Sequence, residues 1–411
     1  MRLQPLFLLP LLVRLDVLAT PLATPDQHLL ASDSDDGDPP PSGVSVPFFA
    51  SLERFARLVD ITYCVGTTGV SPPFSCASRC KDFPSLHLER TWNTGLLLSD
   101  SCGYIAVDHG EEKKTKDGVR GVLVHGPAII VAFRGTYSIT NTIVDLSTVP
   151  QEYVPYPAPD DGDEGEGEPE PRCPNCTVHM GFMSSWQSAR EVVLPALKAA
   201  REKHPDYPVH LVGHSLGGAV AALAALELRL SLGLTDMTVT TFGEPRIGNK
   251  GLVNYLDRAF GLKNRSIEDA EKLPYRRVTH IDDPVPLLPL SEWGFRSHAG
   301  EVYISKAELQ PTPEDLRLCR GDNDEECMGG AETEDWLGWT MTRLMRGQEP
   351  GVEARGWKGK LAGFPTRLKL WQLFFAHRDY FWRLGLCVPG GDPADWGRGR
   401  YNVTLDEMDD L

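Results

Sequence analysis

The stretch Val209-His-Leu-Val-Gly-His-Ser-Leu-Gly-Gly218 decides the fold of this chain. Its first four residues predict a short buried strand, and the Ala/Leu-rich residues 216–232 predict a helix. Ser215 therefore stands on the turn between the two elements, with Gly213 and Gly217 two residues away on either side. Both positions need glycine because the strand and helix backbones nearly touch at such a turn. This is the context of a nucleophile elbow, which exposes a serine hydroxyl.

Other segments extend the same pattern in both directions along the chain. Apolar runs predict strands at 127–133, 237–242, 276–281 and 300–304, and an amphipathic helix is predicted at 186–203. Strands that alternate with helices indicate a mainly parallel central sheet with helices on both faces. Together with the elbow, this predicts the α/β-hydrolase fold.

A serine hydroxyl is a weak nucleophile unless a histidine, held by a carboxylate, takes its proton. In this fold the three groups follow the chain order Ser, Asp or Glu, His. The carboxylate candidates are Asp282 and Asp283, which directly follow the strand predicted to end at Ile281. Both stand where the carboxyl edge of a parallel sheet faces the site, so the choice between them stays open at this point.

Only three histidines follow Ser215, namely His280, His298 and His377. His280 lies inside the predicted strand, too close to the aspartates to be oriented by them. His298 precedes the predicted last core strand, whereas His377 follows it, where the base normally lies. We favour His377 and keep His298 as the alternative.

An oxyanion hole needs one N–H group from the residue after the serine and a second from another strand's loop. Leu216 supplies the first. Thr136, which follows the strand ending in Phe133-Arg-Gly135, is the candidate for the second. This chemistry needs neither a cofactor nor a metal ion.

The composition indicates an exported protein. The formal charge of −16 argues against nucleic-acid binding, which needs a basic surface. Residues 1–19 are predicted to be a signal peptide, and the nine cysteines agree with an extracellular location. Apart from this segment, no sequence window approaches the ~20 apolar residues of a membrane span. We expect the protein to be a monomer. Candidate glycosylation sequons begin at Asn175, Asn264 and Asn402.

The remaining segments divide the chain around one hydrolase domain, predicted at 48–392. Residues 20–47 are acidic and Pro-rich, which predicts a disordered tail or propeptide, and 393–411 are expected to be a C-terminal tail. The loop 157–172 carries seven carboxylates between 160 and 170 and is predicted to be solvated; a calcium site there would lack EF-hand spacing. Residues 328–372 form an insertion.

Seven motifs in order resemble the class 3 lipases, the fungal secreted triacylglycerol lipase family. They span about Phe55 to Cys387, and they are Ile61-Thr-Tyr-Cys64, Phe133-Arg-Gly-Thr136, Val178-His-Met-Gly-Phe182, Gly213-His-Ser-Leu-Gly-Gly218, Glu244-Pro-Arg-Ile-Gly-Asn249, Asp283-Pro-Val-Pro286 and His377-Arg-Asp-Tyr-Phe381. The resemblance implies the triad Ser215, Asp283 and His377, with Thr136 and Leu216 as oxyanion donors. It thereby favours Asp283 over Asp282 and weighs against His298.

The resemblance also implies a pairing of the cysteines. It predicts disulfides Cys64–Cys387, Cys76–Cys80, Cys173–Cys176 and Cys319–Cys327, and it leaves Cys102 as a buried thiol. A redox role for the Cys173-Pro-Asn-Cys176 motif has no thioredoxin-like strand context to support it. Closing the long loop from Cys64 to Cys387 is expected to contribute about 4–5 kcal/mol in a chain-entropy model.

By resemblance, a lid helix covers the site at 137–146, with Ile139, Ile143 and Leu146 on one apolar face. Exposing about 300 Å² of such a face costs roughly 7 kcal/mol, which a lipid surface offsets. Many lids of the family carry tryptophan where this chain has Thr142. The insertion is longer than the family's usual link, and we hypothesise that its tryptophans help to bind lipid: Trp336, Trp339, Trp357 and Trp371.

These observations predict a secreted serine lipase that hydrolyses glycerol esters, triacylglycerol first, at a lipid–water interface. A phospholipase A1 or a feruloyl esterase on the same scaffold is the nearest alternative, since only pocket and lid details separate them. A non-catalytic lipid-binding protein is the remote alternative, and the intact set of catalytic residue types argues against it.

Overall fold

The structure is a computed structural model, and it describes residues 43–95, 100–114, 121–136, 150–153, 173–263, 270–322, 324–328 and 376–396. All of them belong to one compact unit, residues 39–411. Several predicted features lie outside the described residues: the signal peptide 1–19, most of the tail 20–47, the lid 137–146, the acidic loop 157–172, Asn264, Asn402, and the insertion 328–372 apart from Met328.

A central sheet of eight strands is the frame of the molecule. The strand order is β16-β15-β13-β11-β10-β7-β4-β3. Five neighbours from β15 to β7 run parallel, whereas β16 at one edge pairs antiparallel with β15. At the other edge β4 runs antiparallel to β7, and β3 runs antiparallel to β4. The bounds are β3 Leu86–Asn93, β4 Cys102–Asp108, β7 Ala128–Phe133, β10 Val209–His214, β11 Met237–Phe242, β13 Tyr275–His280, β15 Glu301–Ile304 and β16 Leu316–Leu318.

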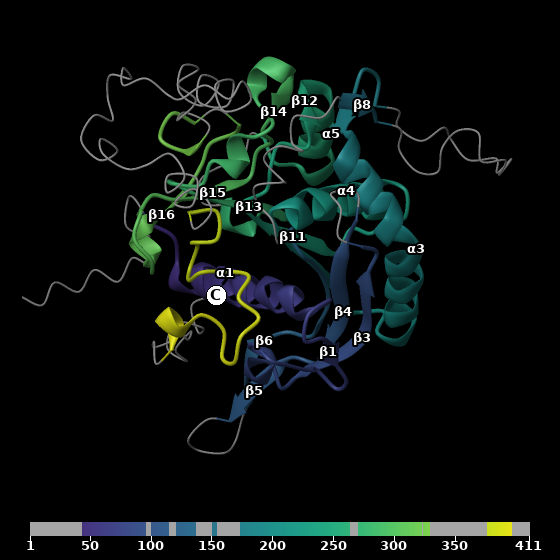
Figure 1. Ribbon diagram of the computed structural model, residues 1–411, viewed down its shortest axis with the longest axis vertical. Helices are drawn as coiled ribbons and strands as arrows, with labels where there is room; N and C mark the ends of the chain where they lie inside the picture. The colour runs from purple at the N-terminus through teal and green to yellow at the C-terminus, as the bar shows by residue number, and fades with distance from the viewer. Residues whose placement is uncertain are drawn as a thin grey trace, which may run out of the picture. The chain divides into compact units, whose positions relative to one another are not determined.

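Helices cover both faces of this sheet, as the sequence predicts. Alternate residues of β7 pack into two different cores: Ile129 and Val131 face the helices α3 and α4, and Ile130 and Ala132 face α1. Strands buried on both faces read as continuous apolar runs, which is why 127–133 shows no alternation. Figure 1 shows α1 on one side of β4 and β3 and α3 on the other. The bounds are α1 Val46–Ile61, α3 Met180–Lys203, α4 Leu216–Leu230 and α5 Lys250–Phe260.

The predicted boundaries need correction at three places. Helix α1 begins at Val46, two residues before the predicted start of the domain, and the Ser45 side chain caps it by accepting a hydrogen bond from the Phe48 N–H at 3.3 Å. Helix α3 begins at Met180, not at Trp186, and its first residue directly follows strand β9 without a side-chain cap. The third correction concerns the predicted tail 393–411, since Asp395 is buried and belongs to the domain.

Smaller strands complete the fold. A sheet ordered β14-β12-β9-β8 lies beside α5, and two hairpins are formed by β1 with β2 and by β5 with β6. Asn175, two residues before β9, is exposed, and its backbone carbonyl accepts a hydrogen bond from Asn249 Nδ2 at 2.8 Å. The bounds are β1 Val70–Ser71, β2 Ser75–Cys76, β5 Glu111–Lys114, β6 Gly121–His125, β8 Pro150–Glu152, β9 Thr177–His179, β12 Gly248–Asn249 and β14 Phe295–Arg296.

The chain's last described segment, 376–396, is tied to α1 and to the loop 76–82 by an arginine–tryptophan cluster. The Arg57 and Arg79 guanidinium groups lie over the Trp382 ring at 4.5 and 4.8 Å from its centroid. Arg79 Nη1 donates to Asp395 Oδ2 at 2.7 Å, and Arg79 also pairs with Asp60 at 3.4 Å. We call these five residues the Trp382 cluster.

The predicted disulfides are all present, and one of them reinforces the same attachment. Cys64–Cys387 joins the segment after α1 to 376–396, and the other pairs are Cys76–Cys80, Cys173–Cys176 and Cys319–Cys327. Cys102 is a buried free thiol, and burial raises its pKa to about 11. A buried thiol with a raised pKa is chemically inert, so Cys102 serves the core.

Candidate active site

Ser215 occupies the strained turn that the sequence predicts. It joins β10 to α4 with φ 57° and ψ −130°, one of two non-glycine residues with positive φ among the described residues. A Cβ atom on Gly213 would lie 2.3 Å from the Gly217 carbonyl oxygen, and one on Gly217 would lie 2.5 Å from the Phe133 oxygen. The glycine requirement of the elbow is therefore confirmed. Strain of this kind persists only where the surrounding structure enforces it.

The carboxyl ends of four neighbouring parallel strands carry three predicted residues and one glycine that was not predicted. Thr136 follows β7, Ser215 follows β10, Gly243 follows β11 and Asp283 follows β13. In open α/β sheets the reactive groups gather at this edge, where loops leave the strands. At the same edge, Asp283 contacts His377, although the two residues are 94 positions apart in the sequence.

Asp283 holds His377. Both carboxylate oxygens of Asp283 lie 2.9 Å from His377 Nδ1. Asp283 also accepts hydrogen bonds from the Tyr380 hydroxyl at 2.6 Å and from the Val285 N–H at 2.9 Å. Burial raises the pKa of Tyr380 well above 10, and the Asp283 charge raises it further, so Tyr380 remains a proton donor. Asp283 and His377 are 1 % and 0 % exposed, so this pair lies in a dry site.

The alternatives from the sequence are placed elsewhere. Asp282 is exposed, although it is the neighbour of Asp283. His280 lies in β13, and its Nδ1 accepts a hydrogen bond from the Asp282 N–H at 3.3 Å. His298 lies with Nε2 at 3.0 Å from Glu244 Oε1 and Nδ1 at 2.6 Å from the Ala299 carbonyl. His377 is therefore the histidine that contacts the predicted carboxylate.

Gly243 is a site residue that the sequence reasoning missed. It has φ 59°, and a Cβ atom there would lie 2.8 Å from His377 Cε1 and 2.9 Å from Asp283 Oδ2. Any side chain would therefore displace the imidazole or the carboxylate. The position stands directly before the quoted motif that begins at Glu244, and a glycine at the end of a predicted strand was the available signal.

Two buried polar atoms at this edge have no hydrogen-bond partner among the described residues: Ser215 Oγ and His377 Nε2. Buried polar atoms are nearly always paired, so an unpaired one needs an explanation. A hydroxyl oxygen and an imidazole nitrogen, both unpaired on neighbouring elements, are the two groups between which general-base catalysis moves a proton.

Leu216 and Gly135, the residue before Thr136, both lie next to Ser215. Leu216 is the first residue of α4, so its N–H stands at the positive end of the helix dipole. Gly135, the residue before Thr136, lies against the elbow, because a Cβ atom there would be 2.8 Å from Ser215 Cβ. Thr136 itself is half-buried. The lid residues Ile139, Ile143 and Leu146 lie outside the described residues.

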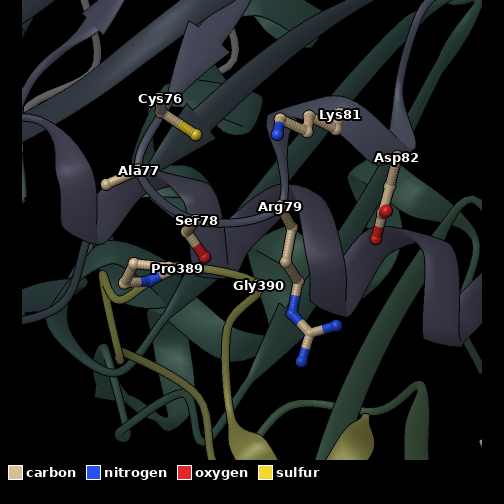
Figure 2. A pocket seen from close by; sticks show the side chains of 8 residues that line it. All are labelled: Cys76, Ala77, Ser78, Arg79, Lys81, Asp82, Pro389 and Gly390. Carbon is tan, nitrogen blue, oxygen red and sulfur yellow. The ribbon is translucent and has the colours of Figure 1, made fainter. Parts of the chain in front are cut away.

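The cavity in Figure 2 is not part of this site. It has a volume of about 270 Å³ and is lined by the loop 76–82 together with Pro389 and Gly390. None of these residues belongs to the Ser215 region. Among the described residues, no group of three or more His, Cys, Asp or Glu side chains is arranged to hold a metal ion. No described helix has the length and apolar character to cross a membrane.

Comparison with known proteins shows to which family the chain belongs. The model of the family described as lipase (class 3) matches residues 130–293, which include Thr136, Ser215 and Asp283. The chain is 60% identical over 378 residues to "Secreted mono- and diacylglycerol lipase 2" of Gibberella zeae, covering 91% of this chain and 90% of that protein. The chain belongs to the class 3 lipase family. This lipase is a secreted carboxylic ester hydrolase, as the sequence predicts.

Other relatives agree with this placement. The lipase is 58% identical to "Lipase A" of Sodiomyces alcalophilus, covering 92% of this chain and 89% of that one. Among solved structures, the Lip2 lipase of Yarrowia lipolytica superposes with a TM-score of 0.61 at 26% identity, covering 84% of this chain and 97% of that chain. The α/β-hydrolase fold is thereby confirmed, and the substrate of this lipase is a lipid ester.

Proposed function

We propose that this lipase cleaves mono- and diacylglycerols through a triad of Ser215, His377 and Asp283. His377 Nε2 takes the proton from Ser215 Oγ as the oxygen attacks the ester carbonyl. Asp283 accepts the Nδ1–H hydrogen bond, which fixes the tautomer and stabilises the imidazolium. The observation that carries the triad is the pair of 2.9 Å contacts between Asp283 and His377, next to an unpaired Nε2.

The remaining steps follow from the same groups. The N–H groups of Leu216 and Thr136 bind the oxyanion, and the α4 dipole adds to that stabilisation. His377 then gives its proton to the leaving glycerol oxygen, and the acyl group stays on Ser215. Water attacks this ester with His377 again as the base, and the fatty acid leaves. Atoms and charges balance without a cofactor.

The proposed substrates, mono- and diacylglycerols, differ from the triacylglycerol expected from the sequence. The relative from Gibberella zeae is named as a mono- and diacylglycerol lipase, and it shares 60% of its residues with this chain over 91% of the length. Two more distant relatives, from Penicillium cyclopium and Penicillium camembertii, carry the same description at 31% identity. We therefore extend this preference to the present lipase.

Rates of fatty-acid release test the proposal. We expect emulsified diolein and monoolein to be cleaved faster than triolein, and the Ser215→Ala variant to be inactive on all three. Phosphatidylcholine emulsions and methyl ferulate provide the arms for phospholipase A1 and feruloyl esterase activity. Triolein cleaved fastest would overturn the substrate preference, and an active Ser215→Ala variant would overturn the triad.

We also propose that the segments outside the described residues keep their predicted roles. Residues 1–19 act as a signal peptide, 137–146 act as the lid at a lipid interface, and the insertion 328–372 contributes lipid contacts through its tryptophans. Deleting 330–365 tests the last role. We expect weaker binding to oil droplets in a folded variant that still reacts with a fluorophosphonate, and unchanged droplet binding would contradict it.

A further inference from the structure

His214 connects the serine's strand to the histidine's backbone. It is the last residue of β10 and is 1 % exposed. Its Nε2 lies 2.9 Å from the backbone carbonyl oxygen of His377, and its ring packs against the His377 ring at a centroid distance of 4.7 Å. Because Ser215 is the next residue along the chain, one side chain bridges the backbones that carry the two proposed reacting groups.

The hydrogen-bond partners of His214 define where its proton lies. A backbone carbonyl accepts but never donates, so Nε2 must carry the hydrogen that faces the His377 oxygen. Nδ1 lies 2.5 Å from the Tyr63 hydroxyl oxygen. In the neutral ring Nδ1 is bare and accepts the Tyr63 proton. Burial lowers the pKa of His214 well below 6.5 and the adjacent His377 lowers it further, so the neutral ring is the form present.

Tyr63 extends this connection to the oxyanion side. It belongs to the Ile61-Thr-Tyr-Cys64 motif, to which the proposed mechanism assigns no step. A Cβ atom on Gly135 would lie 2.5 Å from the Tyr63 hydroxyl, so that hydroxyl lies against the backbone one residue before Thr136. Tyr63 is 0 % exposed and is anchored beside the Cys64–Cys387 disulfide. A rigid, buried phenol therefore stands between the strand ends of β7 and β10.

We propose that Tyr63 and His214 form a positioning relay for the base. Tyr63 O–H donates to His214 Nδ1, and His214 Nε2–H donates to the His377 carbonyl, which fixes the His377 backbone relative to Ser215. Asp283 orients the imidazole ring, and His214 sets where that ring stands. The relay rests on the proposed function, because it acts through His377. Neither Tyr63 nor His214 touches the reacting atoms, so both are positioning residues.

Amide substitutions separate the two hydrogen bonds. In His214→Gln the terminal amide reaches the place of Nε2 and donates to the His377 carbonyl. In His214→Asn the shorter amide reaches only the place of Nδ1 and keeps the Tyr63 contact. In His214→Leu both bonds are lost. The assay uses p-nitrophenyl butyrate in free solution, so that kcat and KM are measured without a lipid interface, and thermal unfolding checks each fold.

We expect His214→Leu and His214→Asn to lower kcat by about 100-fold with KM unchanged, since a misplacement of about 1 Å costs this much. His214→Gln should recover most of the loss. Tyr63→Phe should lower kcat less, and combined with His214→Leu it should add nothing. A structural role alone would not separate Gln from Asn, so equal kcat values for those two variants would overturn the relay, as would an unchanged kcat in His214→Leu.

His210→Leu is the matched control. His210 lies four residues earlier on β10 and packs against Phe55 at a ring distance of 5.2 Å, away from the Ser215 region. Its kcat should equal that of the wild type. The proposed function has separate controls: a wild type that fails to react with a fluorophosphonate, or a Ser215→Ala variant that reacts, would reject the triad. These results concern the fluorophosphonate reaction of Ser215, whereas the relay is judged by the kcat values of the His214 variants, so a failure of the triad can be distinguished from a failure of the relay.

Discussion

The two ends of segment 376–396 are held in opposite ways. At its first end, His377 is fixed by Asp283 and by the neutral ring of His214. The Nε2 atom of His377 is left without a hydrogen-bond partner among the described residues. Towards its other end, from Trp382 to Asp395, the Trp382 cluster places two guanidinium groups over one indole ring and pairs Arg79 with two carboxylates. Cys64–Cys387 closes the same end covalently.

This difference separates function from stability along one short stretch of chain. Sites that act on a substrate keep polar groups unpaired and backbone strained, at a cost in stability that the rest of the fold offsets. In the Trp382 cluster the buried charges form ion pairs, and both guanidinium groups lie over the indole ring. Substitutions at the first end should therefore change rates, and those at the second should change the free energy of unfolding.

The largest expected effect is the loss of activity in Ser215→Ala. Removing the proposed nucleophile should lower kcat about 10⁶-fold, as in enzymes whose triad acts as a unit. The unfolding free energy should be unchanged or higher, because a buried hydroxyl without a partner is removed. Ester hydrolysis and urea unfolding measure the two quantities. A destabilised variant would contradict the separation even if it were inactive.

Asp283→Asn should have the next largest effect, about 10⁴-fold in kcat, because an amide favours the wrong tautomer of His377. The exposed neighbour Asp282 supplies the matched control, since Asp282→Asn changes the same charge one residue away. We expect that control to remain within about threefold of the wild type, because a surface charge is screened. Equal losses in both variants would show a general field effect and would remove Asp283 from the triad.

Trp382→Ala tests the other end of the segment. The side chain is 0 % exposed and two guanidinium groups lie over its ring, so its removal should cost about 3–5 kcal/mol of unfolding free energy. The kcat of the folded variant, measured well below its melting temperature, should stay close to that of the wild type. Trp293→Ala, at a ring that is 38 % exposed, should change stability by about 0.5 kcal/mol or less. A kcat loss larger than tenfold in Trp382→Ala would show that the Trp382 cluster also affects catalysis, and would contradict the separation of the two regions.

The contacts that distinguish these regions differ in how visible they are in the sequence. The elbow could be predicted because strand, turn and helix are adjacent, and the two glycines state the steric requirement locally. The partners of Trp382 could not, because Arg79 and Asp395 are separated by 316 positions and neither stands in a motif. For the same reason the burial of Asp395 could not be predicted from the sequence. Gly243 and His214 stood in or beside quoted motifs, but their roles depend on which strand ends become neighbours.

The smallest expected effect is the contribution of Asp60 to the pH dependence of the unfolding free energy. Burial raises the pKa of Asp60 to about 6, although the Arg79 charge lowers it in part. An unfolded aspartate has a pKa near 4, so between about pH 4 and 6 the folded chain holds a proton that the unfolded chain releases. The folded state binds more protons there, and this contribution to the unfolding free energy falls as pH rises through that window, by about 3 kcal/mol in total.

Asp60→Asn cannot titrate and isolates this contribution. The difference in unfolding free energy, wild type minus variant, should decline from pH 4 to pH 6 and level off above it, as measured by urea unfolding at fixed ionic strength. The Gly385 N–H, which donates to Asp60 Oδ1 at 2.7 Å, keeps an amide oxygen as its acceptor in the variant. A difference that rises with pH would mean that Arg79 holds Asp60 charged, and that this end of the segment is a fully ionised cluster.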